Sequence, residues 1–300
     1  MMKIKVLICI AALSMTVGLS GCSKSTTNAS QEKKNMDSID QGETAIESIG
    51  EDLYIEKIAE GAYVVNHVFP WEANSMVVEM DNSDIIMVDT PYTPEATRDL
   101  LNWVNTHYEN QKIIAINTGF HFDNLGGNQA LIEKNIPIYG SSLTTELISE
   151  AGEASRKLML EWLNKPESKR FYEAYQHIPY IGPTEQFDLQ QDDMQVDIEQ
   201  LAIHSKEIEI YFPGASHSPD NLVVYFPQKR ILFGGCMVKS LESTDLGNTA
   251  DADLEEWPKS VNRVLERYKD KADIIVPGHG KCGNSDLLVH TIELGGGRAN

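Results

Sequence analysis

The sequence of 300 residues is long enough for one large domain or two small ones, and its apolar share of 41% is that of a globular protein that buries a core. The formal net charge at pH 7 is −20, from 45 acidic and 25 basic residues. Because no basic stretch is present that could neutralise phosphates, the composition argues against binding to nucleic acid.

The N-terminal segment is typical of a bacterial export signal. Lys3 and Lys5 precede an apolar run that is too short to span a bilayer comfortably, and residues 19–22 read Leu-Ser-Gly-Cys. That ending resembles a lipobox, which implies attachment of a lipid to Cys22 after the signal is removed. We therefore expect an exported protein held on the bacterial membrane by its N-terminal lipid, facing the periplasm or the cell exterior. Ordinary cleavage near Gly21, which leaves a free Cys22, is the alternative.

The chain divides into three expected parts. Residues 1–21 form the signal peptide, and residues 22–51 begin with the lipidated cysteine and continue as a stretch rich in Ser, Thr, Asn, Gln and charged side chains. Such a stretch cannot bury enough apolar surface to fold, so we interpret it as a flexible tether. Residues 52–300 carry the apolar patterning of one folded domain.

The folded part mixes strands with helices. Short apolar runs bounded by turn residues predict strands, and longer stretches with apolar residues on one side predict helices. The predicted strands lie at 63–65, 76–78, 85–88, 113–116, 186–212, 222–226, 230–233 and 274–276. The predicted helices lie at 94–108, 128–134, 144–177 with a break near Pro166, 254–268 and 287–294. Strands in a meander followed by strands mixed with helices, twice over, predict two packed sheets with helices outside.

Metal-binding side chains gather in loops that follow the predicted buried strands. The loops cover 117–127, 213–221 and 276–280, and a further strand ends at Cys236. A catalytic zinc ion takes about three protein ligands from nitrogen, sulfur or oxygen donors and keeps one position open. Asp123, Cys236 and His279 supply one donor of each kind, so we expect them to bind one zinc ion tightly.

Four short motifs follow one another in a specific order. They read His-x-Asp-x-x-Gly-Gly at 121–127, Gly-x-x-His-Ser-x-Asp-Asn at 214–221, Gly-Gly-Cys at 234–236 and Pro-Gly-His-Gly at 277–280. This order and spacing resemble the class B, or metallo, β-lactamases, in the subclass that uses a cysteine ligand, over about residues 52–294. The resemblance implies an α/β fold, the αββα sandwich of two packed mixed β-sheets with helices on the outer faces. It also implies zinc-dependent hydrolysis of the amide bond of β-lactam antibiotics, and hence antibiotic resistance.

One position departs from the family pattern. The family reads His-x-His-x-Asp in the first loop, whereas this chain has Gly119 in place of the first histidine. A glycine cannot bind a metal, so the second zinc site of the family would keep only His121 and His217. We therefore expect a second zinc to be weakly held or absent. A related mono-zinc subclass that prefers carbapenems has Asn at this position, which would imply a bias toward carbapenems here.

The resemblance also suggests roles for residues around the metal. His121, Asp123 and His217 correspond to residues that would position or activate the attacking water. Asn248 matches the residue that polarises the lactam carbonyl, and Lys239 matches the residue that binds the substrate carboxylate.

Several positions keep an alternative interpretation. Phe69 and Trp71 lie in a segment that resembles a mobile apolar flap over the substrate, but Trp71 could instead be packed in the core. Lys239 could be a solvated surface residue. Cys236 could form a disulfide with Cys282, as exported cysteine pairs often do.

The remaining candidates are weaker. Five histidines are expected to be structural or exposed: His67, His107, His177, His204 and His290. Asp89 is expected to orient a metal-binding loop without binding metal itself.

We expect a monomer whose partner is a small β-lactam. The same fold could also hydrolyse another ester, thioester or lactone, and a chain lacking one ligand could be a zinc-binding lipoprotein that has lost catalysis.

Overall fold

The computed structural model describes residues 45–109, 111–189 and 208–299. The expected signal peptide, Cys22 and the tether up to residue 44 lie outside the described residues, as does the predicted strand pattern between 190 and 207. None of the helices in the described part of the chain combines the length and the apolar character needed to cross a bilayer.

The larger sheet has eight strands that neighbour one another in chain order. They are β1 (Ile46–Gly50), β2 (Leu53–Ala59), β3 (Ala62–Val68), β4 (Glu72–Glu79), β5 (Ile85–Val88), β6 (Ile113–Ile116), β7 (Ile138–Ser141) and β8 (Glu185–Phe187). Strands β1 to β5 pair antiparallel, whereas β5 to β8 pair parallel. Phe69 and Trp71, the residues of the predicted flap, lie at the tip of the β3–β4 hairpin.

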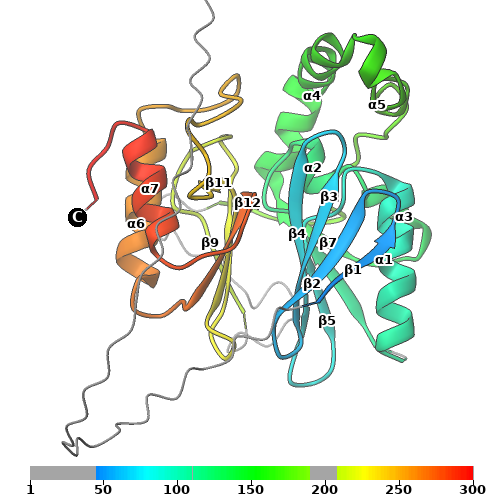
Figure 1. Ribbon diagram of the computed structural model, residues 1–300, viewed down its shortest axis with the longest axis horizontal. Coiled ribbons are helices and arrows are strands. Elements are labelled where there is room, and N and C mark those ends of the chain that lie inside the picture. Colours follow the sequence, from blue (N-terminus) through cyan, green and yellow to red (C-terminus); the bar gives the residue numbers. More distant parts are fainter. Residues whose placement is uncertain (1–44, 110, 190–207, 300) are drawn as a thin grey trace, which may run out of the picture. The chain divides into compact units, whose positions relative to one another are not determined.

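Helices make the crossovers that parallel strands require. α1 (Pro94–His107) joins β5 to β6, and α2 (Phe122–Leu125) with α3 (Asn128–Glu133) joins β6 to β7. α1 begins where Thr93 Oγ1 accepts a hydrogen bond from the Ala96 amide at 3.1 Å and Pro94 takes the first helical position. Between β7 and β8 lies a longer excursion of α4 (Ser142–Leu163), the short helix η1 (Pro166–Ser168) and α5 (Lys169–Tyr175), which we call the helical arm. The arm stands above the end of the sheet (Figure 1).

The smaller sheet has four strands in the order β12-β11-β10-β9. Their bounds are β9 (Glu209–Tyr211), β10 (Val223–Phe226), β11 (Ile231–Lys239) and β12 (Ile274–His279). β10 pairs antiparallel with both β9 and β11, whereas β11 and β12 are parallel and are joined through α6 (Trp257–Tyr268). α7 (Asp286–Leu294) follows β12.

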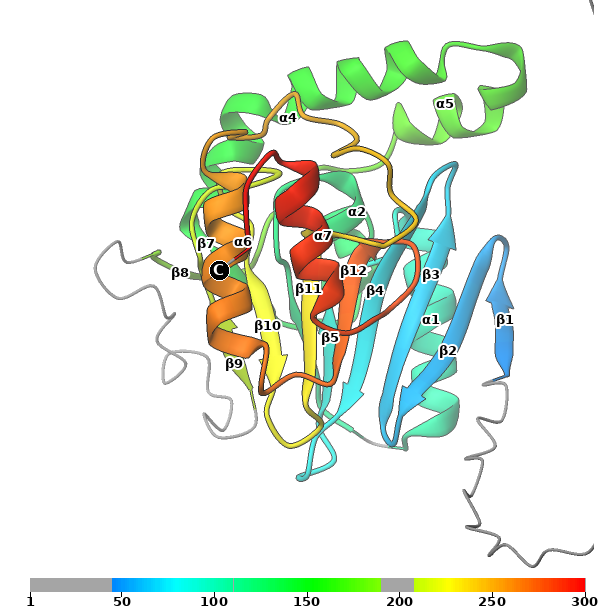
Figure 2. The same cartoon turned by 60° about the vertical axis from the view of Figure 1, so that its left-hand side comes forward.

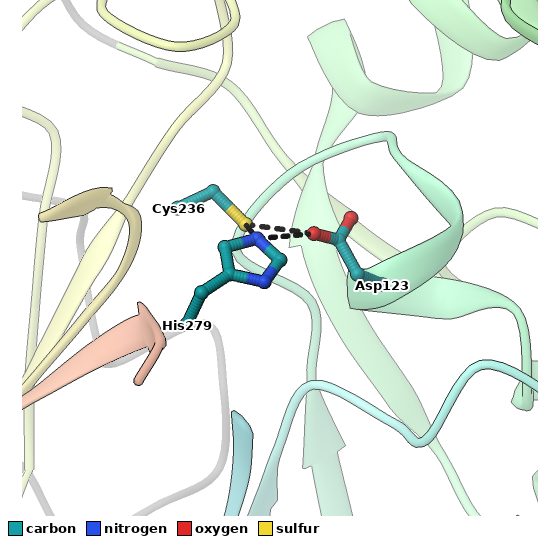
Figure 3. Close-up of side chains that lie close together, drawn as sticks. All are labelled: Asp123, Cys236 and His279. Carbon is teal, nitrogen blue, oxygen red and sulfur yellow. Dashed lines mark hydrogen bonds and ion pairs between the residues drawn. The ribbon is translucent and has the colours of Figure 1, made fainter. Parts of the chain in front are cut away.

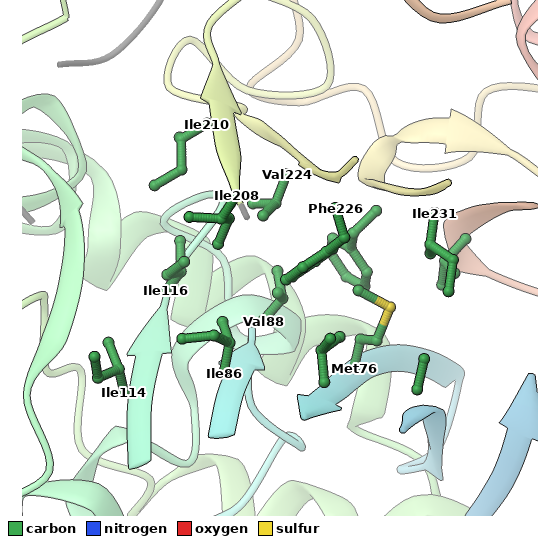
Figure 4. Close-up of a cluster of buried hydrophobic side chains, with 14 of the residues drawn as sticks. Met76, Ile86, Val88, Ile114, Ile116, Ile208, Ile210, Val224, Phe226 and Ile231 are labelled. Atoms are coloured by element: carbon green, nitrogen blue, oxygen red, sulfur yellow. The ribbon is translucent and has the colours of Figure 1, made fainter. Parts of the chain in front are cut away.

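The two sheets pack face to face around a shared apolar core. Met76, Val88 and Ile116 from the larger sheet meet Val224 and Phe226 from the smaller one, all of them buried (Figure 4). A second cluster packs α6 and α7 on the outer face of the smaller sheet, and a third packs α1 and α3 on the outer face of the larger sheet. Figure 2 shows α6 and α7 in front of the smaller sheet, with α1 behind the larger one. The predicted αββα sandwich is confirmed.

Several elements differ from the sequence prediction; β2 and α2, for example, were not predicted. Residues 46–50, assigned to the tether, form β1, so the folded body begins before residue 52. The pattern was missed because β1 is mostly exposed; its pairing with β2 and the 3.1 Å hydrogen bond from Trp103 Nε1 to Glu47 hold it in place. β7 was not predicted, and α6 begins at Trp257, three residues after the predicted start.

Candidate metal centre

Three donors from distant parts of the chain meet at one edge of the sandwich. Asp123 lies in the first turn of α2, just after β6, Cys236 lies within β11, and His279 ends β12. Asp123 Oδ2 is 3.1 Å from Cys236 Sγ and 3.1 Å from His279 Nε2, and the sulfur and nitrogen are 3.9 Å apart (Figure 3). Of all groups of His, Cys, Asp and Glu in the described residues, this is the one set close enough to hold a metal ion.

The spacing of the three donors fits zinc. Ligands at about 2.0 to 2.3 Å from a tetrahedral ion lie roughly 3.3 to 3.8 Å from one another, and the three observed separations fall close to that range. The three donors occupy three corners of such a site, which leaves one corner for water or substrate. The residues present therefore fit a catalytic zinc site.

The negative charges around Cys236 also favour a bound cation. Burial, together with the negative charges of Asp123 and Asp89, raises the pKa of the Cys236 thiol well above its usual value. A divalent cation reverses this effect because it stabilises the thiolate directly. Burial opposes ionisation of Asp123 as well, but the hydrogen bond and charge of His279 hold the pKa of that carboxyl below its usual range.

The hydrogen bond on the far side of His279 fixes its orientation. Its Nδ1–H donates to the backbone carbonyl of Glu72, the first residue of β4. In the neutral imidazole this leaves the Nε2 lone pair facing Asp123 and Cys236. A metal-binding histidine commonly uses its second nitrogen in this way.

His121 and His217 form a neighbouring pair. Their rings lie 5.0 Å apart between centroids, and both side chains are buried against the cavity. His121 Nε2 donates to Asp251 Oδ2 at 2.9 Å, and this pairing raises the pKa of His121 although burial alone would lower it. Burial, and then the positive charges of His121 and Lys239, lower the pKa of His217, so its imidazole is neutral. Within the described residues His217 Nδ1 has no hydrogen-bond partner.

The space beside Gly119 is filled. A Cβ atom at Gly119 would lie 2.8 Å from Asn221 Nδ2 and 3.0 Å from Asn124 Oδ1. Asn221 cannot move away freely, because its Oδ1 accepts from Ser216 Oγ at 3.0 Å and from the Ser218 amide at 2.8 Å. A side chain at position 119 would therefore have to displace Asn221, and no histidine replaces Gly119 without such a shift of its neighbour.

Asp89 supports the first loop without reaching the metal donors. Its carboxylate accepts from the amide and hydroxyl of Thr118, each at 2.7 Å, and from Asn124 Nδ2 at 2.8 Å. Burial raises the pKa of Asp89 to about 8 despite these bonds. The bonds tie together the two ends of the segment that carries His121 and Asp123, in agreement with the orienting role expected from the sequence.

A cavity of about 790 Å³ lies beside the metal donors, and Asp123 and His279 form part of its wall. Its walls include the predicted residues Lys239 and Asn248, together with Trp71, His121 and His217. Lys239 is buried, with its ammonium 5.3 Å above the centre of the Trp257 ring, so its interpretation as a solvated residue is wrong.

The two predicted flap residues have different environments. Trp71 lines the cavity and is 44% exposed, so it is not a core residue. Phe69 packs instead against Phe171 and Tyr175 of the helical arm and is not part of the cavity wall. The structure therefore does not support the predicted substrate contact for Phe69.

The alternative roles of cysteine and histidine are also resolved. Cys236 and Cys282 are both free thiols, so the alternative of a disulfide between them is wrong. His67 is buried, accepts a hydrogen bond from the Tyr92 amide at its Nδ1, and has its pKa lowered to about 4 by burial. It is structural, as expected. His204 lies outside the described residues.

Sequence analysis missed several residues of the cavity. Asp251 beside the cavity was not predicted as a site residue, and nothing in its spacing indicates a bond to His121. Ser155, Met159 and Trp162 of α4 line the cavity because the helical arm returns over the site. A predicted helix gives no sign of where it will be placed in the fold.

Comparisons with known proteins identify the family of the chain. A sequence profile of the Metallo-beta-lactamase superfamily matches residues 68–279. A protein named Metallo-beta-lactamase type 2 from Pseudomonas aeruginosa is 32% identical over 250 residues, which cover 81% of this chain and 84% of that protein. Another of that name from Bacillus cereus is 29% identical, covering 97% of both chains.

Solved structures give the same result. The crystal structure of VMB-1 matches with a TM-score of 0.65 and 29% identity, covering 82% of this chain and 97% of that one. The structure of TMB-1 matches with a TM-score of 0.64 and 28% identity, covering 81% of this chain and 97% of that one.

Proposed function

Because this chain belongs to the metallo-β-lactamase superfamily, we propose that it hydrolyses the amide bond of β-lactam antibiotics with one zinc ion held by Asp123, Cys236 and His279. The observation that carries the proposal is the meeting of carboxylate, thiol and imidazole, with mutual distances suited to zinc, beside a cavity large enough for a small molecule. Relatives named metallo-beta-lactamase support the choice of substrate.

The metal and the protein contribute different parts of the reaction. A zinc ion held by Asp123, Cys236 and His279 would supply a Lewis acid able to stabilise negative charge on the leaving nitrogen of the lactam. The neutral His217 can accept a proton from a water molecule in the cavity, and His121, held by Asp251, can orient that water.

Two further residues of the cavity wall suit the substrate. The Lys239 ammonium lies where it can pair with the carboxylate that β-lactams carry, and burial strengthens such a pair relative to one in water. Asn248 Oδ1 already accepts from the Ala250 amide at 3.1 Å, so its Nδ2 is the group able to donate to a lactam carbonyl.

The state with one zinc is part of the proposal. Only two histidines remain at the position of the second site, and the filled space at Gly119 supports a weak or absent second ion. By analogy with the mono-zinc subclass, this state would favour carbapenems over penicillins.

The proposal is tested with the purified protein. Hydrolysis of imipenem and of benzylpenicillin is measured with and without a chelator, beside the zinc content per chain. We expect one zinc per chain, turnover that the chelator abolishes, and a higher kcat/KM for imipenem. If neither compound is hydrolysed in the presence of zinc, the proposal is wrong, and a zinc-binding protein without this activity becomes the better interpretation.

We further propose that the protein is exported and carries a lipid on Cys22, and that its folded body is a monomer. The support is the order of Lys3, Lys5, the apolar run and the Leu-Ser-Gly-Cys sequence that ends at Cys22. Mass spectrometry of the mature N-terminus tests the lipid, with Cys22→Ala as the control that should leave the protein in the soluble fraction. Size-exclusion chromatography of the body tests the monomer.

A further inference from the structure

A buried carboxylate lies where two distant parts of the chain meet. Asp220 belongs to the 214–221 motif, and its side chain is fully buried. We propose that Asp220 is a positioning residue, which joins the loop of His217 to the first turn of α4 and so holds the proton-accepting histidine and the wall formed by the helical arm in one arrangement. This inference rests on the proposed function, because that reaction gives His217 and the cavity wall their roles.

Asp220 accepts one hydrogen bond from each of the two parts. Ser218 Oγ donates to its Oδ1 at 2.7 Å, and Thr144 Oγ1 of α4 donates to its Oδ2 at 2.7 Å. Burial raises the pKa of Asp220, and the two bonds oppose this because they stabilise the carboxylate. Since a buried carboxylate costs free energy unless donors compensate it, the loop and the helix are joined through one group that needs both.

On the loop side, hydrogen bonds hold the backbone around His217. The Ser216 amide donates to the Ser218 carbonyl at 3.0 Å, and the Ser218 hydroxyl continues to Asp220. The His217 ring packs on Trp257 at 5.4 Å between centroids, but within the described residues its Nδ1 has no hydrogen-bond partner. Because no bond at Nδ1 directs the imidazole, its direction depends on the backbone, and hence on the bond from Ser218 to Asp220.

On the arm side, the bond fixes the base of α4. Ser141 Oγ caps the helix by accepting from the Thr144 amide at 3.0 Å, and the two hydroxyl oxygens lie 2.9 Å apart. The Asp220 carboxylate therefore lies at the first turn of a 22-residue helix, the end at which negative charge is favourable. Ser155 and Trp162 of the same helix line the cavity. A helix rises by about 1.5 Å per residue, so Ser155 lies roughly 16 Å along the axis from Thr144, and a small tilt at the base is enlarged at the wall.

The far end of the arm is held separately. Tyr175 of α5 donates its hydroxyl hydrogen to the backbone carbonyl of Phe69 at 2.9 Å. Loss of the Thr144 bond should therefore shift α4 without releasing the arm. The two sides of Asp220 then predict different kinetic effects, because the loop acts on kcat through His217 whereas the arm acts on KM through the cavity wall.

Removing one hydroxyl at a time separates the two sides. In Ser218→Ala the loop loses its bond, so we expect kcat for imipenem to fall about 10-fold with little change in KM, within the roughly 100-fold that a misplacement of about 1 Å can cost. In Thr144→Val the arm loses its bond but keeps the shape of the side chain, so we expect KM to rise about 3- to 10-fold, the range for one hydrogen bond, with little change in kcat. Equal changes in kcat and KM in both variants, or no change in either, would overturn the positioning role.

Matched controls remove hydroxyls that make no such bond. Thr145 Oγ1 and Ser75 Oγ are buried and have no hydrogen-bond partner in the described part of the chain. Thr145→Val and Ser75→Ala should therefore change neither kcat nor KM.

The carboxylate itself is tested by a pair of variants. Asp220→Ala removes both bonds and should combine the two kinetic effects. Asp220→Asn can still bond to both hydroxyls, so it should restore most of the activity. Equal activity of the two variants would show that the bonds of Asp220 do not position the site.

Two measurements without turnover separate failure of this inference from failure of the proposed function. If the zinc-loaded protein hydrolyses no β-lactam, NMR of the histidine rings still reports the loop, and Ser218→Ala should shift the signals of His217 but not those of His279. Hydrogen exchange reports the arm, and Thr144→Val should speed exchange in the first turn of α4 but not in α6. Unmoved His217 signals together with unchanged exchange in α4 would reject the role of Asp220, whatever reaction the protein catalyses.

Discussion

Two groups of side chains lie side by side at the cavity, and they are built differently. Asp123, Cys236 and His279 come from three separate elements, and each lies within 3.9 Å of the other two through its donor atom. His121 and His217 lie beside them with ring centroids 5.0 Å apart, and their third partner in the family is here Gly119.

The difference teaches that a metal site depends on the space around it as much as on its ligands. The first group has its donor atoms already turned toward one another, helped by the bond from His279 to the Glu72 carbonyl. The second group has Asn124 and Asn221 pressed against the position of the missing side chain. We therefore propose that the first group holds zinc and that the second handles water and protons.

Removing the thiol of the first group should cause the largest loss of both zinc and activity. In Cys236→Ser the hard hydroxyl replaces a thiolate, so we expect zinc content to fall from one per chain toward zero and kcat/KM to drop about 1000-fold, or roughly 4 kcal/mol of transition-state stabilisation. Zinc is measured by mass spectrometry after dialysis. Cys282→Ser is the matched control, since Cys282 is the other free thiol of the described residues and packs on the core between the sheets. It should keep its zinc. Equal zinc in the two variants would contradict the assignment.

Removing a residue of the second group should impair the reaction but not metal binding. For His217→Ala we expect one zinc per chain to remain while kcat falls about 100-fold, the usual contribution of a general base. His177→Ala, an exposed histidine after α5, is the control and should change neither quantity. If His217→Ala loses the zinc as well, the two groups are not independent.

The bond between His121 and Asp251 should govern the pH dependence. The pairing raises the pKa of His121, and in Asp251→Asn burial then dominates and lowers it. A histidine that must be neutral to act on water becomes neutral at lower pH when its pKa falls, so the acid limb of the kcat/KM profile should move to lower pH. NMR titration of His121 gives the same pKa without turnover. A profile that keeps its acid limb in place would show that His121 does not titrate in the reaction.

The parts of the fold that could be predicted are those in which apolar side chains recur with the period of a strand or of a helix. The buried strands β5, β6, β10, β11 and β12 and the amphipathic helices α1, α6 and α7 were predicted, because their apolar residues face the core at regular intervals. β1 could not be predicted, since it is held by backbone pairing and one indole hydrogen bond. The placement of the helical arm could not be predicted either, because Phe171 and Tyr175 give no sign in the sequence of packing on Phe69.

The features of the candidate site likewise divide into those that could be predicted from the sequence and those that could not. Asp123, Cys236 and His279 could be proposed because they lie at strand ends beside glycines, in an order known from a family. The bond from Asp251 to His121 and the contact of Lys239 with Trp257 could not, because each joins segments whose distance is set only by the packed fold.

The smallest effect on zinc is expected where the family ligand is missing. Gly119→His returns a donor, but its Cβ would lie 2.8 Å from Asn221 Nδ2, and Asn221 also holds the turn that carries His217. We therefore expect zinc content to stay near one per chain, and the free energy of unfolding in a chelator to fall by about 1 to 3 kcal/mol, the usual cost of overpacking. Gly119→Ala adds the same Cβ without a ligand, so it should lose a similar amount of stability, and urea unfolding of both variants measures it. If Gly119→His instead gains a second zinc at full stability, then the side chains around Gly119 yield easily, and the contrast between the two groups comes from the missing imidazole alone.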